Sequence, residues 1–371
     1  MKKVFNSLFF LALLVSGLSI TSCEEGGRVE DLKGELILTA SSPLIIADGD
    51  EELVFTAKIG NVDVTSEMEL YVNNIIMDGN VFSTQYPGEY KFYAYCKGQI
   101  SNKITINAAN PALYVNLPED SQTDKFSGFQ RKVLLTEATG TWCGYCPYMI
   151  AALELFSENG SNADKAVIVA AHSGDEFSSA ASDAVISYLK ASSFPSCYVN
   201  LNADALIENN YPDVNAEIIN TMVGVELKEA ARVGISTATA VSVDSTIVGV
   251  RAGVKVGKEG KYRINVWLIE DGIDAYQNGA EGVISHMHIL RGASCTSPIL
   301  GELLGGKDIC SDGETIEFYH EFNAKKEGVV NIANCKIAVM VSATSDTSSS
   351  KYFVNNIIEC GVGESVPFAY N

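Results

Sequence analysis

Basic residues are scarce in this chain of 371 residues, which has 26 lysines and arginines against 46 aspartates and glutamates. The formal charge of −20 repels phosphate backbones, so the sequence argues against nucleic-acid binding. Disorder is excluded as well, because 47% of the residues are hydrophobic and only 19% are charged. The chain is longer than one domain with a single hydrophobic core usually is, so we expect two or three domains.

Long apolar runs are also rare, and the most apolar one lies at the N-terminus. Two lysines precede an apolar stretch over 4–20, which is too short and too poorly flanked to span a membrane. The stretch ends in Ile20–Thr21–Ser22–Cys23, and small residues before a cysteine resemble the bacterial lipoprotein box. This resemblance implies a signal peptide over 1–22 and lipidation of Cys23. An ordinary signal peptide with an incidental cysteine is the alternative.

The nine cysteines are an odd number, which is awkward for an exported protein. Assigning Cys23 to lipid leaves eight that can pair in an oxidising envelope. Four of these, Cys295, Cys310, Cys335 and Cys360, can form two disulfides with three connectivities. Loop proximity favours Cys295–Cys310, whereas Cys96 and Cys197 are expected to be buried free thiols.

Three patterns follow one another along the chain. After a polar tether over 23–33, short alternating strands over 34–108 predict a small immunoglobulin-like β-sandwich, and a linker follows over 109–130. Apolar strands alternate with helical periodicity over 131–232, which is typical of an α/β layer. Strands return over 233–371 without clear helices and predict a second β-sandwich. No sequence repeat relates the two β regions, so we expect a multidomain α+β protein.

The chemistry is concentrated in Thr141–Trp142–Cys143–Gly144–Tyr145–Cys146–Pro147, which follows an apolar strand and opens a helix. Cys143 and Cys146 can form a disulfide across one helical turn, and the helix N-terminus favours a thiolate at the first sulfur. The motif therefore predicts thiol–disulfide exchange, with a purely structural disulfide as the alternative. Zinc needs a second ligand pair, but His172 and Cys197 are single residues. We expect neither a metal nor another cofactor.

The apolar strand, the Trp–Cys–x–x–Cys motif and the following helix resemble thioredoxin-like proteins. The resemblance implies that Cys143 is the attacking thiolate and Cys146 the resolving thiol. It also implies that Glu137, six residues before Cys143, accepts a proton. A later aromatic–proline step resembles the cis-proline segment that faces the thiols in this superfamily. The residues implied to line the substrate groove and its rim are Trp142, Tyr145, Phe194 and Pro195.

A narrower resemblance covers most of the chain. The segments Thr136–Pro147, Leu268–Ile273 and His286–Arg291 resemble the twenty-eight-kilodalton outer-membrane-protein family of anaerobic Gram-negative bacteria. This resemblance implies a lipid-anchored outer-membrane protein, facing the periplasm or the cell surface, with a thioredoxin-like domain followed by a β-sandwich. One hypothesis is thiol–disulfide exchange with exported proteins and an unidentified redox partner. The other is a non-enzymatic adhesin, receptor or binding module at the cell surface.

Three of the four histidines have expected roles that do not involve a metal. His286 and His288 alternate on a predicted strand over 283–290, so they should share one face, where packing or a polar pair is favoured over a metal site. His172 follows the second apolar strand of the α/β region. A strand-end or capping role is favoured for it over a place beside the thiols.

Overall fold

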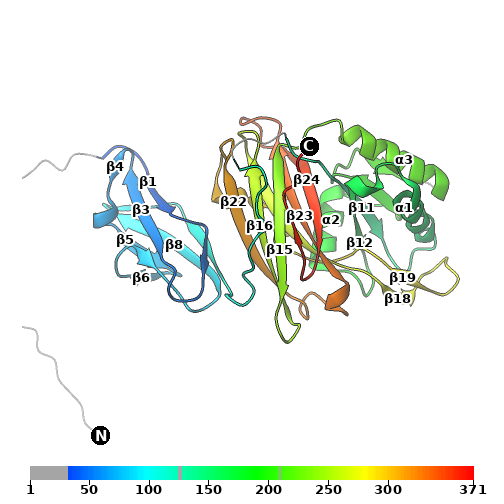
Figure 1. Cartoon of the computed structure of the whole chain (residues 1–371), viewed down its shortest axis with the longest axis horizontal. Coiled ribbons are helices and arrows are strands. Elements are labelled where there is room, and N and C mark those ends of the chain that lie inside the picture. Colours follow the sequence, from blue (N-terminus) through cyan, green and yellow to red (C-terminus); the bar gives the residue numbers. More distant parts are fainter. Residues whose placement is uncertain (1–31, 124–127, 209) are drawn as a thin grey trace, which may run out of the picture.

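The computed structural model describes residues 32–123, 128–208 and 210–371. The predicted signal peptide, Cys23 and most of the tether lie outside these residues. Figure 1 shows a β region, a second β region and an α/β region along the long axis of the molecule. Most regular structure is strand, and the architecture is a multidomain α+β one. None of the helices in the described part is long and apolar enough to cross a membrane.

The N-terminal region is a sandwich of two sheets. Its strands are β1 (Leu36–Ala40), β2 (Leu44–Ile46), β3 (Leu53–Ile59), β4 (Val62–Asp63), β5 (Glu69–Val72), β6 (Ile75–Met77), β7 (Val81–Phe82), β8 (Gly88–Cys96), β9 (Gln99–Ile100) and β10 (Ile104–Ala109). Strands β1, β3, β4 and β7 form one sheet and the others form the second. Every second side chain of β3 is buried, as the strand period requires. The ring centroids of Phe55 and Phe92 lie 4.4 Å apart, so the two inner faces share one core.

The α/β region consists of four strands with helices on both faces. Its elements are β11 (Val133–Thr139), α1 (Cys146–Asn159), β12 (Ala166–His172), α2 (Ala180–Leu189), β13 (Ser196–Val199), β14 (Leu206–Ile207) and α3 (Pro212–Glu226). Strand β12 is parallel to β11, and β13 is antiparallel to it. Side chains alternate along β11, so Val133 and Leu135 pack with α1 and α3 while Leu134 packs with α2. Helix α3 ends at Glu226, six residues before the predicted end of the α/β layer at 232.

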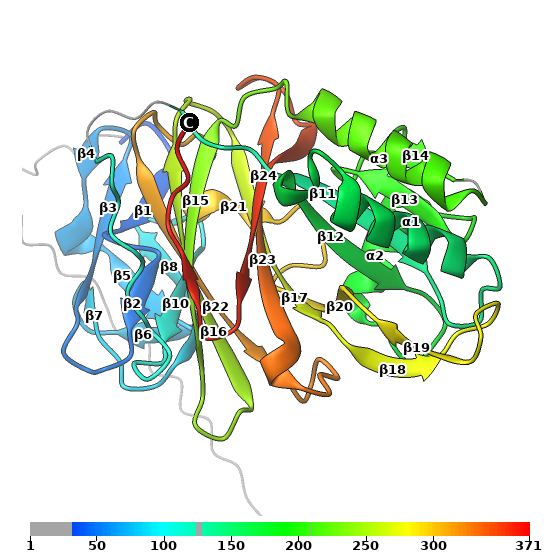
Figure 2. The same cartoon turned by 45° about the vertical axis from the view of Figure 1, so that its right-hand side comes forward.

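The sheet of the α/β region continues into the C-terminal region. The order β14-β13-β11-β12-β20-β17-β23-β24 joins these strands to β17 (Tyr262–Glu270), β20 (Ile289–Ala293), β23 (Cys335–Thr344) and β24 (Tyr352–Gly361), with β21 (Glu302–Leu303) beside β17. The junction is narrow, because β20 pairs with β12 at Ile289 and Ala170 alone. The α/β layer predicted over 131–232 therefore shares a sheet with the strands predicted as a separate sandwich, as Figure 2 shows.

A four-stranded sheet covers the C-terminal half of this long sheet. It contains β15 (Val233–Val241), β16 (Ile247–Val256), β22 (Thr315–Asn323) and β25 (Ser365–Val366), in the order β22-β16-β15-β25. Val250 and Val254 of β16 share a buried cluster with Val266 of β17 and Val339 of β23. In the described residues, short 3-10 helices connect other elements at Thr65–Glu67, Ala163–Lys165, Leu304–Gly306 and Ile332–Asn334.

The segment predicted as a linker is anchored to the four-stranded sheet in its described part. The backbone amide of Asn110 donates to a carboxylate oxygen of Glu321 in β22. Lys255 of β16 is buried, and its ammonium nitrogen lies 2.8 Å from Oδ2 of Asp120. These contacts attach the N-terminal sandwich closely to the C-terminal region.

Two further sequence predictions are wrong. The strand predicted over 283–290 is two strands, because His288 has a left-handed φ of 60° between β19 (Val283–His286) and β20. His286 and His288 therefore do not alternate on one strand. All eight described cysteines are free, so the Cys295–Cys310 disulfide is absent. Their thiols donate instead to the carbonyl oxygens of Pro298 and Leu304, respectively.

Candidate functional site

The two thiols lie where β11 ends and α1 begins. Helix α1 starts at Cys146, and its N-cap residue, Tyr145, has no side-chain bond to the first turn. The backbone N–H of Cys146 donates instead to Sγ of Cys143 at 3.1 Å. Cys143 thus supplies the acceptor that a capping side chain normally supplies. An N–H donor together with the positive end of the helix dipole favours negative charge on this sulfur.

The two sulfurs differ in their environment. Cys146 is fully buried, and burial raises the pKa of its thiol well above the ordinary range. Cys143 is 4% exposed and is flanked by side chains that reach solvent: Trp142 is 49% exposed and Tyr145 is 59% exposed. Cys143 is therefore the more accessible of the two sulfurs.

Glu137 lies inside the sheet, behind the thiols. It occupies the middle of β11, opposite Cys197 of β13 and Ala170 of β12. The residue is 4% exposed, and Oε1 has no hydrogen-bond partner among the described residues. Burial raises the pKa of this carboxyl group to about 8. A group with that pKa can take up or release a proton near neutral pH.

The aromatic–proline step lies beside the thiol motif. The Phe194–Pro195 peptide bond is cis and leads directly into β13. The ring of Phe194 lies 5.4 Å from the ring of Trp142, measured between centroids. The structure thus brings the step before Pro195 next to the residue before Cys143.

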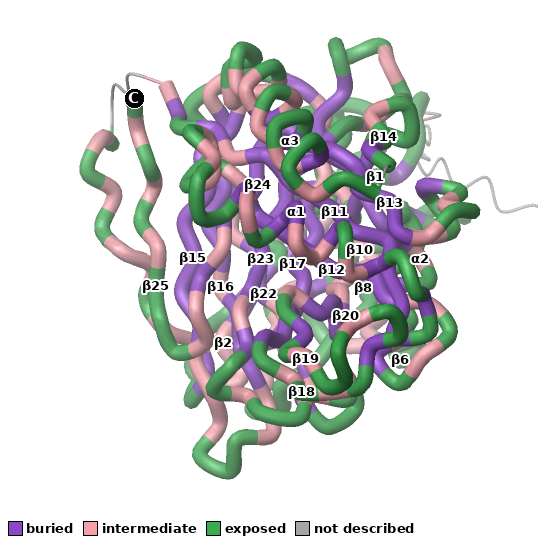
Figure 3. Tube along the Cα trace, turned by 90° about the vertical axis from the view of Figure 1, so that its right-hand side faces the viewer, coloured by how far each residue is buried: buried purple, intermediate pink, exposed green. Residues whose placement is uncertain are grey.

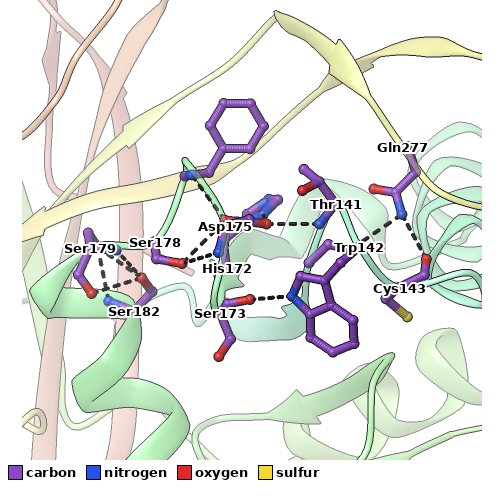
Figure 4. Close-up of polar contacts among 12 residues, drawn as sticks. Thr141, Trp142, Cys143, His172, Ser173, Asp175, Ser178, Ser179, Ser182 and Gln277 are labelled. Carbon is purple, nitrogen blue, oxygen red and sulfur yellow. Dashed lines mark hydrogen bonds and ion pairs between the residues drawn. The ribbon is translucent and has the colours of Figure 1, made fainter.

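A buried polar network that the sequence analysis missed supports the loop before Cys143. Nδ1 of His172, the last residue of β12, lies 2.8 Å from Oδ2 of Asp175. The same oxygen accepts the backbone N–H of Thr141, and the indole N–H of Trp142 donates to the carbonyl oxygen of Ser173 (Figure 4). The sequence contained one signal for this site: β12 ends at His172 and Asp175 follows it, at the edge where β11 also ends.

A second missed contribution comes from a distant part of the chain. The hairpin of β18 (Ile273–Tyr276) and β19 leaves the C-terminal region after β17 and reaches the thiol motif. The amide of Gln277, at its tip, donates to the carbonyl oxygen of Cys143 at 2.9 Å. Figure 3 shows this hairpin at the surface of the α/β end of the molecule, over the buried strands. No sequence pattern connects Gln277 with Cys143.

A cavity of about 350 Å³ lies between β11, α1 and the segment around the end of β19. Residues that line it include Glu137, Thr139, Leu153, His172, His286 and Met287. Burial lowers the pKa of His286, and its Nε2 has no partner in the described structure. No group of three or more histidine, cysteine or acidic residues is arranged to hold a metal ion within the described ranges.

The model of a family described as outer membrane protein Omp28 matches residues 182–365. The match spans 184 of the 371 residues, just under half of the chain, and over these residues the chain is similar to the Omp28 family. This match confirms the resemblance to the outer-membrane-protein family and the outer-membrane location, whereas the thioredoxin-like part of the resemblance stays a prediction. The matched residues include Pro195 and the β18–β19 hairpin but not Cys143 or Cys146, so the match supports the family resemblance and leaves the thiol chemistry to be argued from geometry.

Among solved structures, this chain is similar to HBP35 of Porphyromonas gingivalis, at 18% identity and a TM-score of 0.50. The similarity covers 65% of this chain and 78% of that one and shows a shared fold alone. A match to the adhesin InvE of Yersinia pseudotuberculosis covers 88% of this chain and 58% of that one, at 8% identity, but its TM-score of 0.15 carries no argument. No curated protein matches the sequence.

Proposed function

We propose that this protein is an envelope lipoprotein that carries out thiol–disulfide exchange at Cys143 and Cys146. The observation that carries the proposal is the hydrogen bond from the backbone N–H of Cys146 to Sγ of Cys143 at the start of α1. It places one sulfur in an environment that favours a thiolate, while the other is buried as a thiol. The cis Phe194–Pro195 step beside Trp142 adds support for a thioredoxin-like site.

In the proposed reaction, the thiolate of Cys143 attacks one sulfur of a disulfide in an exported protein. The S–S bond of the substrate breaks, one of its sulfurs leaves as a thiolate, and a mixed disulfide forms. Cys146 then attacks Sγ of Cys143 and releases the second substrate sulfur. The substrate gains two electrons, and the protein keeps a Cys143–Cys146 disulfide. A dithiol redox partner returns the site to its reduced form.

Glu137 has the properties of the proton acceptor for the second attack. The Cys146 thiol must lose its proton to become a nucleophile, but burial opposes formation of its thiolate. Negative charge on Glu137 also raises the pKa of Cys146, so the two groups interact electrostatically. A carboxylate with a pKa near 8 is a stronger base than an ordinary glutamate and can take that proton.

The residues around Cys143 fit an extended polypeptide substrate. The exposed rings of Trp142 and Tyr145 offer apolar area on either side of the sulfur. In the proposed groove, Phe194 and Pro195 form the opposite wall, and the substrate backbone runs along the step into β13. Lipid on Cys23 would hold this site at the outer membrane.

Insulin reduction by dithiothreitol tests the proposal. The wild-type protein should accelerate the reaction, and Cys143→Ser should abolish the acceleration. Incubated with insulin in the absence of dithiothreitol, Cys146→Ser should stop at the mixed disulfide and hold the substrate covalently. Cys96→Ser is the matched control, because Cys96 is a buried thiol of the N-terminal sandwich, and it should retain full activity. A wild-type protein without acceleration, or an unaffected Cys143→Ser variant, would disprove the proposal.

A binding module is the second candidate function. It is favoured by apolar side chains that the N-terminal sandwich leaves exposed, which include Ile75, Ile76, Tyr86 and Ile100. A redox titration separates the two candidates. An exchange catalyst should have a reduction potential above about −300 mV, whereas a structural disulfide usually lies below that value.

A further inference from the structure

The tip of the β18–β19 hairpin is bonded to the backbone of the thiol motif. Gln277 is fully buried, and its Nε2 donates to the carbonyl oxygens of Cys143 and Gly140 at 2.9 and 3.3 Å (Figure 4). Asn278 continues the contact: its backbone N–H donates to the carbonyl oxygen of Thr141, and its side-chain amide donates to that of Trp142. Four successive carbonyl groups, from Gly140 to Cys143, thus accept hydrogen bonds from two neighbouring residues.

The next residue of the hairpin shows how close the two backbones are. Gly279 has a left-handed φ of 83°, and a Cβ atom there would collide with the carbonyl oxygen of Gly144. Only glycine satisfies both the conformation and the close approach. The hairpin is therefore fitted to the thiol motif through its backbone as well as through two amide side chains.

The Gln277 amide has three acceptors, of which one is the carbonyl oxygen of Asn278 and the other two, in Gly140 and Cys143, belong to the turns that set the position of Cys143. The carbonyl oxygen of Gly140 accepts the N–H of Cys143 at 3.0 Å, and the carbonyl oxygen of Cys143 is 3.4 Å from the backbone nitrogen of Cys146. The Gln277 side chain therefore bonds to the first residue of both turns, Gly140–Cys143 and Cys143–Cys146. Loosening either turn would move Sγ of Cys143 away from the Cys146 N–H that stabilises its negative charge.

We propose that Gln277 is a positioning residue for the Cys143–Cys146 site, so that the hairpin of the C-terminal region completes the thiol site of the α/β region. The inference rests on the proposed thiol–disulfide exchange. Gln277 acts through the backbone and does not touch the substrate. It favours the reduced form, because the charge on Sγ of Cys143 exists only when the disulfide is open.

The test is a redox titration of the full chain in glutathione buffers, with Gln277→Met as the variant. Methionine has a similar length but no N–H donors, so the side-chain volume is kept while both bonds to the thiol motif are lost. The ratio of reduced to oxidised Cys143–Cys146 in a fixed buffer should fall at least ten-fold, which corresponds to about 30 mV. Alkylation of Cys143 by iodoacetamide at neutral pH should slow in parallel.

A glycine pair provides a second variant and its control. Gly279→Ala should push the tip away from Gly144 and lower the same ratio, whereas Gly282→Ala should leave it unchanged. Gly282 has a similar φ of 90°, but a Cβ there meets nothing within 4 Å, so both variants share the backbone strain and differ in the collision. Wild-type potentials in both Gln277→Met and Gly279→Ala, with exchange activity intact, would overturn the inference and leave the proposed function standing. A wild-type protein without exchange activity would overturn both.

Discussion

Nδ1 of His172 lies 2.8 Å from Oδ2 of Asp175, and both side chains are only 2% exposed. Burial alone would raise the pKa of Asp175. The hydrogen bond with His172 and the hydrogen bonds from nearby backbone N–H groups nevertheless hold the pKa of this carboxyl group below its usual value. Because Oδ2 also accepts the N–H of Thr141, this carboxylate ties the end of β12 to the loop that carries Cys143.

Asp175→Ala should lower the free energy of unfolding by about 3–5 kcal/mol, because it leaves His172 and the N–H of Thr141 buried without their acceptor. Asp175→Asn keeps one acceptor oxygen, so it should lower the free energy of unfolding by clearly less than Asp175→Ala. Urea unfolding of both variants at pH 7 measures the difference. Equal losses would show that the carboxylate does not hold this loop.

Stability should fall as the pH rises from about 5 to 8 because of Glu137. The pKa of this carboxyl group is about 8 in the folded chain against 4.5 for an ordinary glutamate, so the folded state binds more protons across that range. Each pH unit between the two values weakens folding by up to about 1.4 kcal/mol. A glutamine side chain does not titrate, so Glu137→Gln should make the free energy of unfolding depend less on pH. Urea unfolding of both proteins from pH 5 to 8.5 measures the effect, and parallel profiles would contradict it.

Glu270 stabilises the part of the long sheet where the C-terminal strands reach the α/β region. Its Oε2 lies 2.8 Å from Nε of Arg291 in β20, and its Oε1 accepts the N–H groups of Val330 and Asn331. Both charged side chains are buried. Glu270→Ala leaves Arg291 without its partner and should cost about 3–5 kcal/mol.

The matched control for this prediction is Glu89→Ala, which breaks an exposed pair with Lys91 and should change stability by less than about 1 kcal/mol. Chemical denaturation measures both variants. Since β17 and β20 belong to the sheet shared with β12, the loss at Glu270 should destabilise the α/β and C-terminal regions in one transition. Separate transitions for these two regions would contradict that expectation.

Local patterns predicted individual elements well. Short alternating strands are expected over 34–108, and β3 in that range alternates buried and exposed side chains along its whole length. The same reasoning placed Cys143–Cys146 between an apolar strand and a helix, where it lies. It failed at His288, where a single left-handed residue divides one predicted strand into two.

The amino-acid sequence by itself determined the resemblance to the outer-membrane-protein family, the succession of β, α/β and β regions, and the position of the two thiols at the start of α1, because these depend on residue types and short periods. Only the tertiary structure decided that β20 continues the α/β sheet and that Gln277 bonds to the backbone of Cys143. Both depend on hydrogen bonds between backbone or amide groups that are far apart in the chain. Such groups have the same chemistry at every position, so no sequence pattern identifies their partners.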